Sequence, residues 1–265
     1  MSTIDFGLMY RNAAGFFTAA VAALLLVFGC GTASAQSTKL SQHDALAALN
    51  QVAYAGKSLD YTGVFVIQKG EYFETCKITH LGSQGLEREK IERLDGDPIE
   101  ITRAGPELLV YMPDKKIVKS EMGVSERSFP SLTQDQIATV GQNYDVFVGT
   151  VDRIAGRFAT HITLLPKDKL RYRHELWIDQ KTGLQIKAQM YTERSELVEQ
   201  IMFTEVVIGN HVSHAMTRSA YEDVAHSWKL DRGARSKLQH GSTVKAWLVN
   251  KPPPGFKQVM QLRRK

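Results

Sequence analysis

The feature that most constrains the fold is a series of short, strand-like segments separated by residues typical of tight turns. In the first half of the chain these segments are residues 61–68, 72–81, 86–94, 99–103, 107–112 and 116–121. Glycine, proline and aspartate occupy many of the intervening positions, and these residue types tolerate the dihedral angles of turns. Connections this short favour antiparallel pairing, because parallel strands need a crossover of about a dozen residues or more.

A second series of strand-like segments follows at residues 144–151, 158–166, 171–179, 184–192 and 197–208. Residues 184–191 alternate between apolar and polar side chains, which fixes the register of that strand. Asp179 begins the clearest hairpin turn, and Gly183 is available for its left-handed position. The two series together predict an α+β protein that is mainly β, with one curved antiparallel sheet of about 10 or 11 strands.

Two short helices are predicted to cover the open side of this sheet. The first begins at Ser41, whose spacing to Asp44 is that of a capping box, and it ends near Gly56. The second begins after Thr133, which also has capping-box spacing, and Gly141 stands where a glycine often follows the last turn. Apolar residues at helical intervals follow each cap, so both helices are expected to pack on the sheet.

Residues 1–35 have the pattern of a secretory signal peptide. Arg11 precedes an apolar run, and small residues end at Ala35. The uninterrupted apolar centre, residues 16–28, is within the roughly 7–15 residues of a signal sequence and shorter than the ~20 that span a bilayer. We therefore expect cleavage between Ala35 and Gln36, with an uncleaved membrane anchor as the alternative.

Lipidation at Cys30 is a second form of processing, because residues 27–30 resemble a lipobox. Either route places the folded chain in the periplasm. Removal of the signal peptide leaves Cys76, which is expected to be a buried core residue. The net charge of +5 suits lipopolysaccharide phosphates, anionic lipids or an acidic protein segment as partners, and equally suits ordinary solubility. Export argues against a nucleic-acid partner.

The sequence lacks the short motifs that commonly indicate catalysis. It has no Gly-x-Ser-x-Gly elbow, Cys-x-x-Cys pair, phosphate-binding glycine loop or metalloprotease helix motif. His211 and His214 have a spacing that suits two metal ligands, but no third ligand accompanies them. Glu175 and Asp179 are more typical of solvated strand residues at a turn than of an acid pair. We therefore expect a protein that is not an enzyme and that has neither a metal nor a cofactor.

The strands carry more large apolar side chains than a sheet with one covered face needs. A sheet curled around its concave face can enclose an apolar cavity for acyl chains. The candidate cavity residues are Phe65, Ile67, Tyr72, Tyr111, Phe147, Trp177, Tyr191 and Phe203. The alternative is that these side chains pack the core against the two helices.

The strand pattern ends after the second series, which indicates a domain boundary. We expect residues 36–208 to form one domain and residues 209–240 to be a linker with a short helix around residues 216–225. Residues 243–249 have the composition of a new strand, and a proline-rich turn follows it. One strand and a turn cannot bury a core alone, so residues 241–265 are either the incomplete start of a second domain or an appendage on the first.

Residues 144–204 resemble the second half of the RseB/MucB family of sigma-E regulatory proteins. The matching motifs are Arg153-Ile-Ala-Gly156-Arg157, Pro166-Lys-Asp168, Arg171-Tyr172, Leu176-Trp177-Ile-Asp179, Thr182-Gly183-Leu184 and Glu199-Gln200. Weaker similarity extends to Trp247 and to residues 254–256, which resemble the start of the family's smaller C-terminal domain. The resemblance implies an unclosed β-barrel similar to the lipoprotein carriers LolA and LolB, with helices over the concave face.

The resemblance also implies a role in the sigma-E envelope stress response. A family member would bind the periplasmic segment of a membrane-spanning anti-sigma factor of the RseA/MucA type and protect it from proteolysis. Lipopolysaccharide or lipoprotein acyl chains would release it. The chain departs from the family pattern in that only the first strand or so of the C-terminal domain is present. The alternative function is a periplasmic lipoprotein carrier or outer-membrane insertase of the LolA/LolB type, and the formation of a homo-oligomer stays open.

Overall fold

The computed structural model describes residues 37–83, 85–122, 134–209, 211–232, 252–254 and 256. All of these residues belong to one compact unit that runs from Ala35 to Lys265. Its helices are α1 (Gln42–Ser58) and α2 (Gln134–Asn143), together with the short 3₁₀ helices η1 (Pro113–Lys115), η2 (His214–Thr217) and η3 (Ala225–Ser227). Its strands are β1 (Thr38–Lys39), β2 (Tyr61–Lys69), β3 (Tyr72–Leu81), β4 (Arg88–Arg93), β5 (Glu100–Ala104), β6 (Glu107–Met112), β7 (Ile117–Met122), β8 (Tyr144–Ile154), β9 (Arg157–Pro166), β10 (Arg173–Asp179), β11 (Gln185–Tyr191), β12 (Leu197–Ile208) and β13 (Lys229–Asp231).

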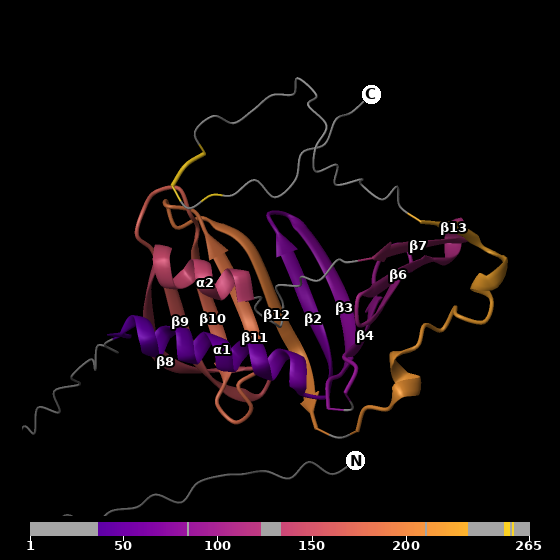
Figure 1. The fold of residues 1–265 in the computed structure, drawn as a ribbon, viewed down its shortest axis with the longest axis horizontal. Coiled ribbons are helices and arrows are strands. Elements are labelled where there is room, and N and C mark those ends of the chain that lie inside the picture. The colour runs from indigo at the N-terminus through magenta and orange to yellow at the C-terminus, as the bar shows by residue number, and fades with distance from the viewer. Residues whose placement is uncertain are drawn as a thin grey trace, which may run out of the picture. The chain divides into compact units, whose positions relative to one another are not determined.

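The described strands form one 13-stranded sheet in the order β1-β8-β9-β10-β11-β12-β2-β3-β4-β5-β6-β7-β13 (Figure 1). Neighbouring strands are antiparallel, except that β13 runs parallel to β7. Because β1 and β13 stand at the two ends of this order, the sheet does not close into a complete barrel. The expected mainly β fold with an unclosed antiparallel sheet is therefore confirmed.

Every strand predicted from the alternation pattern is present, as β2 to β12. The bounds of β3, β6 and β12 coincide with the predicted residues 72–81, 107–112 and 197–208, and the other bounds differ by a few residues. The edge strands β1 and β13 were not predicted. They contain 2 and 3 residues, which is too short for an alternation to be visible in the sequence.

Helix α1 begins at the predicted cap residue, Ser41. Ser41 Oγ accepts a hydrogen bond from the Asp44 backbone N–H at 3.2 Å and donates one to the Asp44 carboxylate at 2.6 Å. The first bond satisfies one of the N–H groups that have no partner inside the helix. The helix continues past the predicted end near Gly56 to Ser58, and the Leu59 N–H then bonds to the Ala55 carbonyl.

Gly141 lies inside helix α2, which corrects the expectation that it follows the last turn. The helix ends at Asn143, whose side-chain amide donates a hydrogen bond to the Thr139 carbonyl at 3.0 Å. A Cβ atom at Gly141 would lie 3.0 Å from Leu46 Cδ2 of α1. The glycine is therefore explained by the close approach of the two helices rather than by a left-handed cap.

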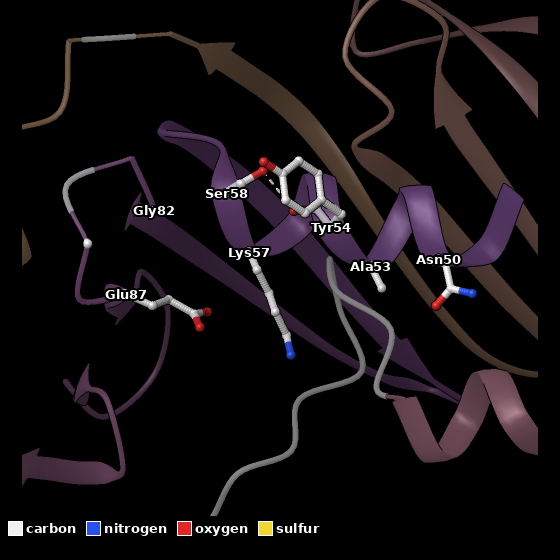
Figure 2. A pocket seen from close by; sticks show the side chains of 8 residues that line it. Asn50, Ala53, Tyr54, Lys57, Ser58, Gly82 and Glu87 are labelled. Atoms are coloured by element: carbon white, nitrogen blue, oxygen red, sulfur yellow. Dashed lines mark hydrogen bonds between the residues drawn. The ribbon is translucent and has the colours of Figure 1, made fainter. Parts of the chain in front are cut away.

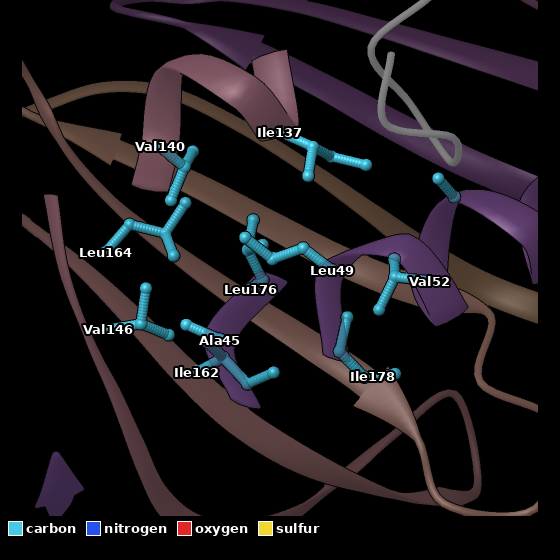
Figure 3. Packing of buried hydrophobic residues seen from close by; sticks show 11 residues of the cluster. Ala45, Leu49, Val52, Ile137, Val140, Val146, Ile162, Leu164, Leu176 and Ile178 are labelled. Carbon is cyan, nitrogen blue, oxygen red and sulfur yellow. The ribbon is translucent and has the colours of Figure 1, made fainter. Parts of the chain in front are cut away.

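We call the face of the sheet on which α1 and α2 pack the inner face, and the opposite face the outer face. A cluster of buried side chains joins both helices to strands β8, β9 and β10, as Figure 3 shows. It consists of Ala45, Leu49, Val52, Ala53, Ile137, Val140, Val146, Ile162, Leu164, Leu176 and Ile178. Burial of each large aliphatic side chain contributes about 1.5–3 kcal/mol to stability. The expectation that the helices cover the concave face is thus confirmed.

A second buried cluster continues the core across the middle of the sheet. It consists of Tyr61, Phe65, Cys76, Ile78, Ala159, Trp177, Leu184, Ile186, Phe203 and Val206. Cys76 is 3% exposed, as expected for a core residue, and burial raises the pKa of its thiol to about 12. The thiol is therefore in its neutral form at physiological pH, which is the unreactive form of cysteine.

Residues 211–231, which we call the outer segment, pack against the outer face. Helix η2 contacts β3 and β4, and the chain then adds β13 to the edge of β7. The buried Glu100 carboxylate of β5 accepts hydrogen bonds from Ser219 Oγ at 2.6 Å and from the Ala220 N–H at 2.9 Å. The helix predicted around residues 216–225 is absent, and η2 and η3 flank a run of turns there instead.

Several predicted features lie outside the described residues. They are the signal peptide with its cleavage site at Ala35 and Gln36, the alternative lipidation site at Cys30, and the strand expected at residues 243–249.

Candidate functional site

The eight candidate cavity residues do not share one surface. Phe65, Ile67 and Phe203 lie on the inner face, because Phe65 pairs with Phe203 and Ile67 pairs with Ile201 across β2 and β12. The rings of Phe65 and Phe203 meet edge to face, with centroids 5.9 Å apart. Tyr72 lies at the start of β3, where its side chain is mostly exposed and its hydroxyl donates to Glu74 Oε2 at 2.9 Å.

The other four candidates lie on the outer face. Tyr111 is buried there opposite Glu100, and Phe147 pairs with Lys39 of β1. The Trp177 ring stacks on His161 with centroids 4.5 Å apart, and Lys187 Nζ lies 4.0 Å from its centroid. Arg173 lies over the Tyr191 ring at 4.5 Å. These contacts form an aromatic and charged group on strands β9 to β11, and Trp177 within it also belongs to the second buried cluster, together with Phe65 and Phe203.

A compact aromatic group lies where α1 ends and β2 begins. Tyr61, His80 and Phe203 are all at most 1% exposed. Tyr61 stacks on His80 with ring centroids 4.7 Å apart and meets Phe203 edge to face at 6.4 Å. The contacts fix the imidazole orientation, because stacked and edge-to-face arrangements each have a preferred geometry.

His80 connects the end of α1 to the loop after β3. Its Nδ1 lies 2.8 Å from the Leu59 carbonyl oxygen, and its Nε2 lies 3.2 Å from Glu87 Oε1. Both partners are acceptors, so only the imidazolium form, with a proton on each nitrogen, donates both hydrogen bonds. The hydrogen bond from His80 is the main reason that the pKa of the Glu87 carboxyl lies below its usual value, and burial opposes this shift.

Asp60 holds the same loop through its buried carboxylate. Oδ1 accepts hydrogen bonds from the Gly82 and Ser83 N–H groups, both at 2.9 Å, and Oδ2 accepts one from Ser83 Oγ at 2.5 Å. Burial by itself would raise the pKa of this carboxyl, but the bonds from Ser83 and Gly82 outweigh it and lower the pKa. A Cβ atom at Gly82 would lie 2.2 Å from the Lys57 carbonyl oxygen, so the loop touches the helix backbone.

A cavity of about 350 Å³ lies between α1 and this loop, as Figure 2 shows. It is lined by Asn50, Ala53, Tyr54, Lys57, Ser58, Gly82, Gly85 and Glu87. Its volume is near the lower end of the ~300–1,000 Å³ of small-molecule sites. The lining combines apolar and polar surface and presents the cation of Lys57, the carboxylate of Glu87 and the exposed Tyr54 ring.

A second cavity of about 290 Å³ lies where α1 begins and α2 ends. It is lined by Lys39, Leu40, Ser41, Gln42, Ala45, Gly141, Tyr144, Asp145, Val146 and Lys167. Asp145 pairs with Lys39 at 2.8 Å, which neutralises part of the charge at this cavity.

The residues considered for catalysis and metal binding have structural contacts. His211 Nε2 lies 2.9 Å from Thr62 Oγ1, and no group of three or more His, Cys, Asp or Glu in the described part of the chain is placed to bind a metal. Asp179 is 2% exposed, which corrects the expectation of a solvated carboxylate. It accepts hydrogen bonds from Arg157 Nε at 2.8 Å and Nη2 at 3.0 Å, and from the Thr182 hydroxyl at 2.7 Å.

The sequence pattern did not identify the polar residues that organise the cavity between α1 and the loop. His80 does not stand out in the sequence, although it follows Cys76 and Ile78 at the period of two that marks one face of a strand. This period predicts that His80 lies on the same face of the strand as Cys76 and Ile78, which is the inner face. Asp60 and Glu87 are brought together by contacts between distant segments, which the spacing in the sequence does not indicate.

Among the described residues, no helix has the length and apolar character needed to cross a membrane.

Comparison with known proteins identifies the family. The sequence model of the MucB/RseB N-terminal domain matches residues 44–221, a stretch that begins in α1 and ends in the outer segment. The chain belongs to the MucB/RseB family. MucB of Pseudomonas aeruginosa, named as a regulatory protein of sigma factor AlgU, is 27% identical over 82% of this chain and 65% of its own length. RseB of Escherichia coli, named as a sigma-E factor regulatory protein, is 24% identical over 91% of this chain and 73% of its own length.

Solved MucB structures share the fold of this family member. The complex of Pseudomonas aeruginosa MucA and MucB contains a chain that is 26% identical, with a TM-score of 0.54, over 66% of this chain and 61% of that one. A crystal structure of MucB alone aligns with a TM-score of 0.57 at 26% identity, over 68% of this chain and 64% of that one. This chain spans a little under two thirds of the length of Pseudomonas aeruginosa MucB, the first of the relatives named above. The RseB/MucB resemblance found in the sequence is confirmed.

Proposed function

We propose that this chain is a periplasmic negative regulator of a sigma-E-type stress response, which binds the periplasmic segment of an anti-sigma factor. The observation that carries the proposal is the MucB/RseB match over residues 44–221. Relatives of this family have been solved in complex with MucA and with MucA(peri). Residues 1–35 serve as the export signal in this proposal, and the activity is binding rather than catalysis.

The cavity between α1 and the loop after β3 supports a peptide-binding role. Lys57 is exposed, and its charge helps to lower the pKa of the Glu87 carboxyl after the larger effect of the His80 hydrogen bond. The cavity thus presents a cation and a carboxylate side by side, with Tyr54 beside them. Such a set recognises the backbone and charged side chains of an extended peptide.

Protection and release follow from one equilibrium in this proposal. A bound anti-sigma segment is withheld from a protease for the fraction of time that it is in complex. A lipid that prefers the free regulator shifts the equilibrium towards release, by no more than its difference in affinity for the free and complexed forms. Lipopolysaccharide and lipoprotein acyl chains are the proposed signals.

The test is a binding measurement with residues 36–265 and the periplasmic segment of MucA, in the presence and absence of lipid A. We expect specific binding that lipid A competes away. Lys57→Glu should weaken binding by about tenfold, because charge reversal places like charges beside Glu87. Lys181→Glu, in the exposed turn between β10 and β11, is the matched control and should bind like the original chain.

Two outcomes would count against the proposal. Absence of peptide binding by the folded chain would contradict the regulatory role. Transfer of lipoproteins between membranes without any peptide binding would favour the lipoprotein carrier or insertase of the LolA/LolB type. Equal effects of Lys57→Glu and Lys181→Glu would move the peptide site away from this cavity while leaving the regulatory role in place.

A further inference from the structure

The proline-rich segment near the C-terminus lies against the loop between β9 and β10, where its described residues are drawn in yellow in Figure 1. Arg171 Nη2 donates a hydrogen bond to the Pro254 carbonyl at 2.9 Å. The same guanidinium group lies over the Phe256 ring, with its central carbon 4.6 Å from the ring centroid. One side chain therefore recognises both a backbone carbonyl and an aromatic ring, 83 or more positions away in the sequence.

Arg171 is held in place by its own loop. Its side chain is 7% exposed, and Nη1 donates a hydrogen bond to the Asp168 carboxylate. The other oxygen of that carboxylate accepts the Leu170 N–H at 2.9 Å. The Lys167 N–H bonds to the Asn143 carbonyl at 2.9 Å, which attaches the loop to the end of α2. A side chain ordered in this way loses little further freedom when a segment binds to it.

The chemistry of the loop matches the segment that occupies it. Proline has a fixed φ angle and no N–H group, and the Phe256 N–H donates a hydrogen bond to the Pro253 carbonyl at 3.0 Å, so the segment meets the loop as a turn that presents the Pro254 carbonyl. A planar guanidinium group suits such a carbonyl and also stacks on an aromatic ring.

We propose that residues 167–172 form a docking site for the segment 252–256 of this same chain, with Arg171 as the residue that recognises it. The site ties the proline run to the end of the sheet where α2 finishes and β8 begins. It also accepts a proline–aromatic peptide supplied from outside when the chain's own segment is removed. The inference does not depend on the anti-sigma partner, so each can fail without the other.

The first test is an NMR comparison of the ¹⁵N-labelled chain, residues 36–265, with its Phe256→Ala variant. We expect the amide signals of residues 167–172 to shift on loss of the ring. Phe158→Ala removes an aromatic that is 63% exposed at the other end of β9 and serves as the control. It should leave the signals of residues 167–172 unchanged. Unchanged loop signals in Phe256→Ala would overturn the proposal.

Arg171→Lys tests the recognition residue while it keeps the positive charge. Lysine lacks the planar fork, so it cannot bond to Asp168, bond to Pro254 and stack on Phe256 at the same time, and the segment should be held less firmly. We expect the ¹⁵N heteronuclear NOE of Phe256 to fall from the value of an ordered residue to that of a free tail. A low value already present in the original chain would contradict docking in solution.

A peptide with the sequence of residues 251–256 supplies the third test. A tethered segment acts at an effective concentration in the millimolar range, so it competes with the free peptide for the loop. The peptide should therefore bind Phe256→Ala several-fold more tightly than the original chain. It should not bind the double variant that also carries Arg171→Lys. Equal binding to all three chains would overturn the proposal even if every variant folds normally.

Discussion

Buried carboxylates fix two of the turns in this molecule, and Asp179 is the better defined of the two. Its carboxylate accepts bonds from Arg157 and from Thr182, while Gly183 takes a φ of 77° that completes the hairpin turn. Burial alone would raise the pKa of Asp179, but the hydrogen bonds from Arg157 and Thr182 outweigh burial, so the pKa is lowered. The charged form of Asp179 is therefore the form that stabilises the fold.

Asp179→Asn should reduce the free energy of unfolding at pH 7 by about 2 kcal/mol, because it leaves the Arg157 guanidinium without its charged partner. A carboxyl whose pKa is lower in the folded state stabilises the fold above its unfolded pKa, which is near 3.8. That stability is lost as the pH falls below this value. Urea unfolding should thus show a difference between the two chains that shrinks as the pH falls below about 4.

Asp114→Asn is the matched control, because Asp114 lies exposed in η1. It should change the free energy of unfolding by less than about 0.5 kcal/mol at pH 7. An Asp179→Asn effect no larger than this, or one that stays constant down to pH 3, would contradict the role assigned to the buried pair.

At the scale of elements, the loop after β3 can touch the end of α1 only because Gly82 has no side chain. Gly82→Ala should destabilise the fold by about 3 kcal/mol, because its Cβ would meet the Lys57 carbonyl and the Ser58 backbone, which cannot rotate away. Hydrogen exchange should also increase at the end of α1 and in the loop around Ser83. Gly70→Asn, in the β2–β3 turn at a φ of 59°, is the control and should cost little, since asparagine tolerates that conformation. Tolerance of Gly82→Ala would show that the loop and helix are not in contact in solution.

The elements could be predicted from the sequence because each depends on neighbouring residues. Turn residues and alternation located β2 to β12, and the capping box at Ser41 located α1. The side of the sheet on which an aromatic residue lies was not predictable in the same way. Strands such as β2 have apolar residues on both faces, so the sequence does not indicate which face the helices cover. This is why Phe65 and Tyr111 were assigned to one cavity although they lie on opposite faces.

Contacts between segments that are distant in the sequence could not be predicted either. The outer segment was interpreted as a linker because it is polar and lacks alternation. Its attachment depends on the buried Glu100, whose carboxylate bonds to Ser219, 119 residues later in the chain. The docking of Phe256 on Arg171 is likewise invisible in either local sequence. Residues that act only through such pairings give no periodic signal.

For the whole molecule, the sheet has two halves, which are strands β1 and β8 to β12 and strands β2 to β7 with β13. Because the sheet is continuous, the two halves are expected to unfold together. Strands β12 and β2 join the halves through a ladder that runs from Glu199 and Lys69 to Ile208 and Tyr61. The second core cluster spans the same junction, because it contains Phe203 of β12 together with Ile78 of β3. A shared ladder and a shared core couple the halves, so neither is expected to unfold while the other stays intact.

Tryptophan fluorescence tests this coupling. Trp177 reports on β10 beside the helices, and Trp228 reports on the outer segment, where its ring lies 5.7 Å from that of Tyr221. With Trp247→Phe as background, variants that retain only Trp177 or only Trp228 should give the same urea midpoint. Leu49→Ala, which empties part of the core beneath α1, should cost about 2–5 kcal/mol and lower both midpoints together. A urea midpoint from Trp228 that is lower than the one from Trp177, or that does not move with Leu49→Ala, would contradict the coupling. It would show that the outer segment and the half of the sheet on which it packs unfold independently.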